Sequence, residues 1–342
     1  MIKPFGLRAL ALAFFVLAGI ACREKAHRRP LLPSEKPLKL KFARFDQALW
    51  ALQKVSDTAA FTHINRDFPD FFPLFCIKII NIGGLQTPFF RNRLQEFVED
   101  RYVQEVAASV DSIFPSSVLD RSMDELCEAF THWHALFPKR VVPRVVTMVS
   151  GFNLGIACTS GDLALGLDCF LGQESRFYRL LRFPKYQVGL MTPEHLVSQA
   201  LLGWIGTEFE PTQEGFLETC IAQGKAQWLL EHLLPNVADT LRLGMTAAQL
   251  EWCQDHEAEV WKNLVDKKIL FMKDLSAYRR YTADGPFTPG FPRESPGRLS
   301  HFVGYQIVSA FMAQNPGIQP KSLMEWPDAA SLLAKSKYRP RT

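Results

Sequence analysis

The sequence predicts an α+β fold, a mostly helical single domain around a small antiparallel sheet. Two observations predict it. Apolar residues recur at helical spacing through most of the chain, and one β-branched stretch near the middle is interrupted by a Gly-Asp turn. The 342 residues, 47% hydrophobic and 22% charged, are enough to bury a substantial core.

The N-terminus has the parts of a secretory signal peptide over residues 1–21. Two basic residues precede an apolar run over residues 9–21, which is shorter than the roughly 20 residues that span a bilayer. Cys22 follows directly, as in a lipobox, where the thiol accepts a diacylglycerol. Gly19 is a departure, because Leu is commoner three places before the cysteine. Simple cleavage after Ala21, which would release a soluble protein, is the alternative.

Residues 22–40 are charged, contain prolines and show no apolar period, so we expect a tether that joins the lipid to a globular domain over residues 41–342. Arg23 follows the cysteine, and no aspartate there signals retention in an inner membrane. We therefore expect an outer-membrane protein that faces the periplasm and contacts the membrane through a lipid on Cys22.

Helices are predicted from about Phe45 to Phe137. Residues 91–114 carry apolar side chains at helical spacing, which indicates one continuous helix. A capping-box-like start at Ser122 predicts the beginning of the next helix.

The composition changes after Pro138 to β-branched and apolar residues. The segments 154–158 and 163–170 flank a Thr-Ser-Gly-Asp turn and predict a hairpin, with residues 141–152 as a third strand. Cys158 and Cys169 could face each other there, and both a disulfide and free thiols remain open.

Further helices are expected over residues 194–205, 214–234, 246–264, 298–313 and 328–334. Thr246 and Gln249 form a capping box. Gly297 and Gly304 have the spacing of small residues that allow close helix packing in a core. The Pro- and Gly-rich loop before them is a hypothetical contact surface, and replacing Phe287 and Phe291 with Ser is expected to weaken partner recovery.

Several segments, in this order, resemble the gliding-motility lipoprotein family GldB of the Bacteroidota. They are Arg44-Phe45-Asp46, Phe137-Pro138, Ser150-Gly151-Phe152, 168–178, 224–235, 252, 257–271, 295–308 and 336–340. The departures are Gln223 and Ser300-His301. The resemblance implies an outer-membrane lipoprotein associated with the surface-gliding machinery, although kinship alone does not imply that the host glides.

The layout of that family is also similar to predicted zinc peptidases, whose sites need two His one helical turn apart, a Glu base and a third ligand downstream. Here His195 and Gln199 occupy the helical positions, Leu196 stands where the base would be, and Gln223 stands where the third ligand would be. Amides are poor zinc ligands, and Leu accepts no proton. The sequence therefore predicts at most a degenerate zinc-peptidase-like scaffold, a pseudoenzyme, with no catalytic residue and no bound metal.

Other candidate sites have ordinary explanations. His132 and His134 point about 200° apart on a helix, so one metal cannot easily hold both. Asp162, Asp168 and Glu174 could bind a cation such as calcium, but their spacing matches no standard loop.

The leading functional prediction is a non-enzymatic, lipid-anchored protein that binds other cell-envelope components, with the gliding machinery as one source of partners and no cofactor. The net charge of +4 is spread over the chain, and basic residues do not alternate with aromatics, so no nucleic acid is expected as a partner. A metal-dependent hydrolase with an atypical site is the alternative, and a purely structural or cell-wall-associated lipoprotein is the third possibility.

Overall fold

The computed structural model describes residues 37–52, 58–211 and 214–340. The predicted signal peptide, Cys22 and most of the tether lie outside these residues. At the end of the tether, the backbone N–H of Leu38 donates to Oγ1 of Thr131, 2.8 Å away, in the helix Ser116–Leu136.

The N-terminal third is helical, as predicted, apart from one short strand. Its elements are β1 (Phe42–Arg44), α1 (Phe45–Trp50), α2 (Thr58–Asp67), α3 (Phe71–Leu74) with a π-helical turn (Phe75–Ile79), α4 (Phe90–Glu99), α5 (Arg101–Ile113) and α6 (Ser116–Leu136). The middle of the chain holds β2 (Arg144–Met148), β3 (Ile156–Cys158), β4 (Asp162–Gly166), a 3-10 turn (Leu167–Phe170), α7 (Arg176–Leu180) and α8 (Lys185–Val188).

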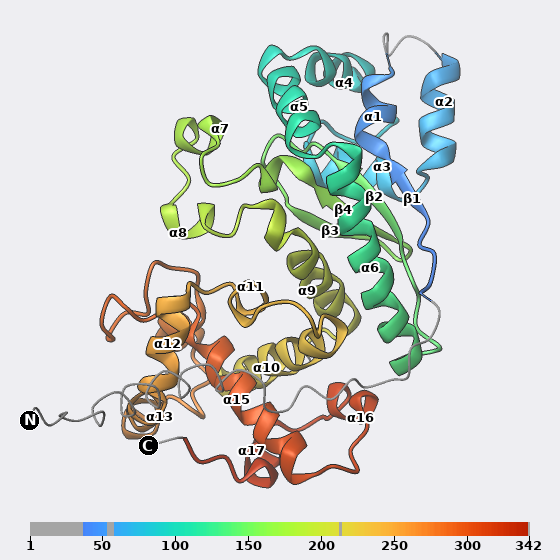
Figure 1. The fold of residues 1–342 in the computed structure, drawn as a ribbon. Helices are drawn as coiled ribbons and strands as arrows, with labels where there is room; N and C mark the ends of the chain where they lie inside the picture. The colour runs from blue at the N-terminus through green and yellow to red at the C-terminus, as the bar shows by residue number, and fades with distance from the viewer. Residues whose placement is uncertain (1–36, 53–57, 212–213, 341–342) are drawn as a thin grey trace, which may run out of the picture.

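The C-terminal half is helical throughout, and its helices gather beneath the sheet in Figure 1. After a 3-10 turn (Pro193–His195) they are α9 (Leu196–Glu208), α10 (Phe216–Leu233), α11 (Asp239–Leu243), α12 (Ala247–Asp255), α13 (Glu257–Asp266), α14 (Leu275–Thr282), α15 (Leu299–Gln314), α16 (Pro320–Met324) and α17 (Ala329–Ser336). Among the residues described, no helix combines the length and the apolar character needed to cross a membrane.

The sheet is mixed, with strand order β1-β2-β4-β3. The predicted hairpin is confirmed as the antiparallel pair β3–β4, and the predicted third strand is β2. The expectation of a purely antiparallel sheet is wrong, because β4 pairs in parallel with β2. After β2 the chain forms β3 at the edge of the sheet, two positions away, and then turns back to form β4 in the position between them. Strands β2 and β4 therefore run in the same direction.

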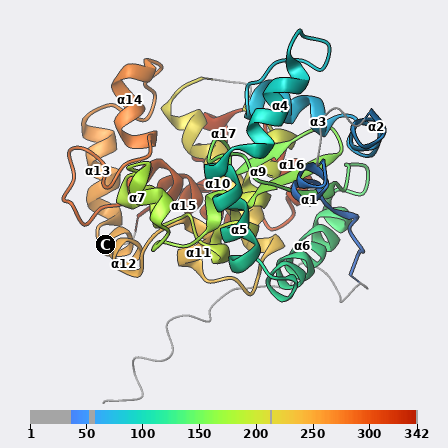
Figure 2. The ribbon, with the colours of Figure 1, turned by 90° about the horizontal axis from the view of Figure 1, so that it is seen from above.

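The two faces of the sheet are covered by different hydrophobic cores. Along β2, Val145 joins the core formed with the later helices, and the next residue, Val146, joins the core formed with α1–α4. This alternation follows from the two-residue period of a strand. Figure 2 shows α1–α3 on one side of the molecule and α12–α14 on the other. The N-terminal core is rich in phenylalanine, with rings such as Phe45 and Phe71 packed edge to face, centroids 4.9 Å apart.

Two predicted helix boundaries are wrong for local reasons. The helix expected over residues 91–114 breaks at Asp100, whose carboxylate accepts a hydrogen bond from the backbone of Val103 and so starts α5 as a new helix. Ser122 lies inside α6, where its hydroxyl donates to the carbonyl of Val118 one turn earlier instead of capping a helix start.

The predicted capping box at Thr246 and Gln249 is confirmed, with both reciprocal hydrogen bonds present. The helix that it begins ends at Asp255, and a break at His256 separates α12 from α13, so the expectation of one helix to residue 264 is wrong. The six cysteines of the described region are free thiols, Cys158 and Cys169 included.

Helices α10 and α15 cross at two glycines, Gly224 and Gly304. A Cβ atom on Gly304 would lie 1.8 Å from the backbone oxygen of Cys220, and one on Gly224 would lie 2.2 Å from the backbone oxygen of Gly304. Both obstructions are backbone, which cannot swing aside. The close packing predicted for Gly304 is confirmed. Gly297 lies before α15, and its backbone packs against Gly285 of the preceding loop, so the expectation that it shares the helix face of Gly304 is wrong.

We predict that Gly304→Ala destabilises the protein by about 3 kcal/mol, because overpacking forces the two helices apart. Gly206→Ala on α9 is the matched control, since nothing lies within 4 Å of its added Cβ and Ala favours a helix by up to about 1 kcal/mol over Gly. Urea unfolding followed by circular dichroism measures both. Equal stability of the two variants would contradict the backbone crossing.

Candidate functional site

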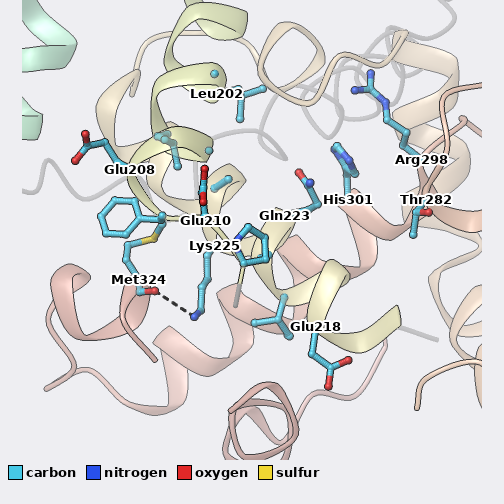
Figure 3. A pocket seen from close by; sticks show the side chains of 18 of the residues that line it. Leu202, Glu208, Glu210, Glu218, Gln223, Lys225, Thr282, Arg298, His301 and Met324 are labelled. Atoms are coloured by element: carbon cyan, nitrogen blue, oxygen red, sulfur yellow. Dashed lines mark hydrogen bonds between the residues drawn. The ribbon is translucent and has the colours of Figure 1, made fainter. Parts of the chain in front are cut away.

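An open cleft of about 1590 Å³ lies between α9 and α10 and the segments around α14, α15 and α16. Figure 3 shows its polar side chains, which come from helices far apart in the sequence. Its lining includes both apolar and charged groups: Leu202, Gly203, Gly206, Glu208, Glu210, Glu218, Ala222, Gln223, Lys225, Arg279, Arg298, His301 and Met324.

The glycine crossing sets the floor of this cleft. Gln223 and Lys225 flank Gly224 on α10, and His301 lies one turn before Gly304 on α15. Figure 3 shows Gln223 beside His301, with Arg298 beyond them and Lys225 pointing away toward Met324. The crossing of α10 and α15 at the two glycines therefore also brings the amide of Gln223 close to the imidazole of His301.

His301 is a neutral imidazole in this position. Burial, followed by the charge of Arg298, lowers the pKa of His301 to about 3. The guanidinium of Arg298 is paired with Asp284 at 2.7 Å, at the start of α15. At neutral pH, His301 therefore offers a hydrogen-bond donor and an acceptor, and no charge.

Lys225 ties α10 to the segment that contains α16. It is 9% exposed, and its Nζ donates to the carbonyl oxygens of Met324 at 3.3 Å and Trp326 at 2.8 Å. Burial lowers its pKa to about 8. The amine is thus held by two carbonyls in a structural role, although its stem lines the cleft.

Three acidic side chains also line the cleft: Glu208, Glu210 and Glu218. Glu208 pairs with Arg140 at 2.8 Å, and Glu218 pairs through Oε1 with Lys273 at 2.5 Å. The second oxygen of Glu218 is buried and has no partner among the described residues. Glu210 is exposed. Charges of both signs and neutral amides therefore line the cleft.

The structure brings the predicted degenerate site together only in part. Gln199 and Gln223 line this cleft, whereas His195 lines a neighbouring hollow of about 650 Å³ that also includes Gln199 and His301. His195 is buried and its Nδ1 lies 3.0 Å from the hydroxyl of Thr192. Leu196 is 0% exposed and belongs to the core, so its position cannot present a base to a substrate.

The zinc-peptidase-like interpretation gains no support. Within the described ranges, no group of three His, Cys, Asp or Glu residues could hold a metal ion. The residue that sequence reasoning missed is His301, which the resemblance marked only as a departure. The spacing of one helical turn between His301 and Gly304 could have identified it in the sequence. The helix that packs against Gly304 contributes Gly224, about 80 residues earlier, so the sequence does not show what His301 faces.

The suggested cation site of Asp162, Asp168 and Glu174 does not form. Asp162 pairs with Arg144 at 2.7 Å. Asp168 is fully buried and accepts hydrogen bonds from the backbone N–H groups of Ser150 and Phe152. Glu174 is exposed.

Phe291, in the proline-rich loop, packs against Trp252 and Tyr281 with centroids 6.1 and 6.4 Å away. The expected loss of partner recovery when Phe287 and Phe291 become Ser stays a prediction. At position 291 that substitution would also disturb this packing.

We predict that His301 makes the protein less stable in mild acid. The unfolded histidine titrates near 6.5, while the folded one stays neutral down to about 3, so below pH 6.5 the unfolded state binds the extra proton. The wild type should lose about 3 kcal/mol more than His301→Gln between pH 6.5 and 4. Urea unfolding at both pH values measures the free energy of unfolding of each protein. The contributions of other titratable groups cancel in the difference between wild type and variant. Equal losses of unfolding free energy in the wild type and in His301→Gln would contradict a neutral His301.

Comparison with known proteins gives one family. The model of the family described as gliding motility protein GldB matches residues 29–340. Searches of curated proteins and of solved structures found no match. Because the family match covers the tether end, the sheet and every helix of the cleft, this chain belongs to the gliding motility protein GldB family.

Proposed function

We propose that this protein is a non-enzymatic lipoprotein that works by holding a segment of another envelope component in the cleft between α9, α10 and α15. The observation that carries the proposal is the size and lining of that cleft. Its volume of about 1590 Å³ exceeds the roughly 300–1,000 Å³ of ordinary small-molecule pockets. A segment of a polymer, such as a polypeptide, suits that space better than a metabolite.

The side chains that line the cleft support a role in binding a partner more than a catalytic role. Gln199, Gln223 and the neutral His301 can each donate and accept hydrogen bonds, as a peptide backbone requires. Leu202 and Ala222 supply apolar contact between them. Lys225, the one buried amine of the lining, is already held by two backbone carbonyls.

The family name connects this role with gliding, and we propose that the partner belongs to that machinery. We further propose that a lipid on Cys22 anchors the chain in the outer membrane, facing the periplasm. The support is the arrangement of apolar run and cysteine in the sequence.

The test is a cleft-filling substitution. Gly206 lines the cleft on α9 and has open space around its added Cβ, so Gly206→Trp should fold and project an indole into the binding space. Gly206→Ala is the matched control. In the host, we expect Gly206→Trp at normal protein level to reproduce the surface-spreading or envelope defect of the deletion, and Gly206→Ala to behave as wild type.

Wild-type behaviour of a stable Gly206→Trp protein would contradict binding in the cleft. The hydrolase alternative has its own measurement. Stoichiometric zinc in the purified chain, lost in both His195→Ala and His301→Ala, would replace a binding role with a metal-dependent one.

A further inference from the structure

A basic and apolar surface lies outside the cleft, on α7, the turn after it and Lys185 at the start of α8, and Lys185 also lines the smaller hollow near His195. Leu180 is 66% exposed and Leu181 is 46% exposed, next to each other at the end of the helix. Figure 1 shows α7 at the margin of the molecule, above α8. We call Leu180, Leu181 and the four basic residues Arg176, Arg179, Arg182 and Lys185 the α7 surface.

The charges of the α7 surface are largely unpaired. Arg176 pairs with Glu105 at 2.6 Å. No acidic side chain of the described structure forms an ion pair with Arg179, Arg182 or Lys185, all of which are exposed. From residue 172 to 188 the chain has four basic residues and one acidic residue, Glu174.

Buried contacts of Phe177 and Tyr178 hold α7 in place. Phe177 and Tyr178 are buried, and the Tyr178 hydroxyl donates to the carbonyl of Asp168 at 2.9 Å and accepts from the N–H of Leu171 at 2.7 Å. The Phe152 ring lies 5.8 Å from both the Phe177 and Tyr178 rings. The exposed leucines are therefore presented in a fixed place and do not need to be ordered on binding.

We propose that the α7 surface docks on the anionic headgroups of a phospholipid membrane, with Leu180 and Leu181 inserted among them. Two exposed leucines within a few residues of three exposed cations that form no ion pair with any described residue are the pattern of an interfacial membrane contact. Residues 23–36 separate Cys22 from the described structure, and 14 residues have a fully extended limit of roughly 50 Å. A body anchored through Cys22, as proposed above, can therefore lie on the membrane surface.

Binding to vesicles tests this without the lipid anchor. The mature chain carrying Cys22→Ala is mixed with sedimenting vesicles of phosphatidylcholine alone or with 30 mol% phosphatidylglycerol. We expect binding to the anionic vesicles only, weakened by raising NaCl from about 50 to 500 mM because salt screens exposed charges.

Matched variants locate the contact. Arg179→Gln with Arg182→Gln should lower the partition coefficient by about 25-fold, since each cation near an anionic surface contributes roughly fivefold. Lys267→Gln with Lys268→Gln removes two exposed charges elsewhere and should change it less than about twofold. Leu180→Ser with Leu181→Ser should weaken binding about tenfold, whereas Phe271→Ser, at a residue that is 65% exposed, should not.

Equal binding to neutral and anionic vesicles, no binding at all, or equal losses in the two charge variants would overturn the proposal. Preferential capture of an acidic peptide with no affinity for vesicles would overturn it too and would indicate a protein partner. Gly206→Trp should leave vesicle binding intact, so failure here and failure of the proposed cleft function are separate results.

Discussion

The backbone contact between α10 and α15 is the constraint on which the rest of the C-terminal half depends. At Gly224 and Gly304 the two helices approach so closely that either Cβ would meet backbone atoms. That approach places Gln223 and His301 side by side and directs Lys225 toward the carbonyls of Met324 and Trp326. The floor of the cleft is thus a consequence of helix packing.

The other half of the molecule depends on buried carboxylates. Asp46 lies between Arg44 and the hydroxyl of Thr147, and so joins the first helix to β2. Asp168 holds the turn after β2 through the backbone of Ser150 and Phe152, where Gly151 and Phe152 both adopt positive φ. Burial raises the pKa of Asp168, while its hydrogen bonds oppose that rise. Tyr178 donates to the carbonyl of Asp168 and packs against the Phe152 ring, which links this turn to the α7 surface.

Local signals in the sequence predicted local structure well. The capping box at Thr246 and the β3–β4 hairpin both follow from residues near one another in the chain. The close packing at Gly304 was predicted from a local glycine, but its partner Gly224 lies about 80 residues earlier. The break at Asp100 could be missed because the apolar period continues through it. Strand β1 has only three residues and exists because β2 pairs with it.

The site was less predictable, because its members meet only through long-range packing. Gln199 and Gln223 were identified from the spacing of a resembling family, and the structure places both in one cleft. Nothing local joins them to His301 or Arg298, which come from α15 and the residue before it. The direction of β4 relative to β2 has the same origin, since it depends on where the chain places β3.

The central claim is that the cleft holds another envelope component, and crosslinking in living cells tests it most directly. A photoreactive benzoylphenylalanine at Leu202 faces the cleft, and the same group at Val265, an exposed position of α13 outside it, is the control. We predict a discrete light-dependent adduct from position 202 that disappears when Gly206→Trp is added, and none from position 265. No adduct from position 202, or the same adduct from both positions, would contradict a binding cleft.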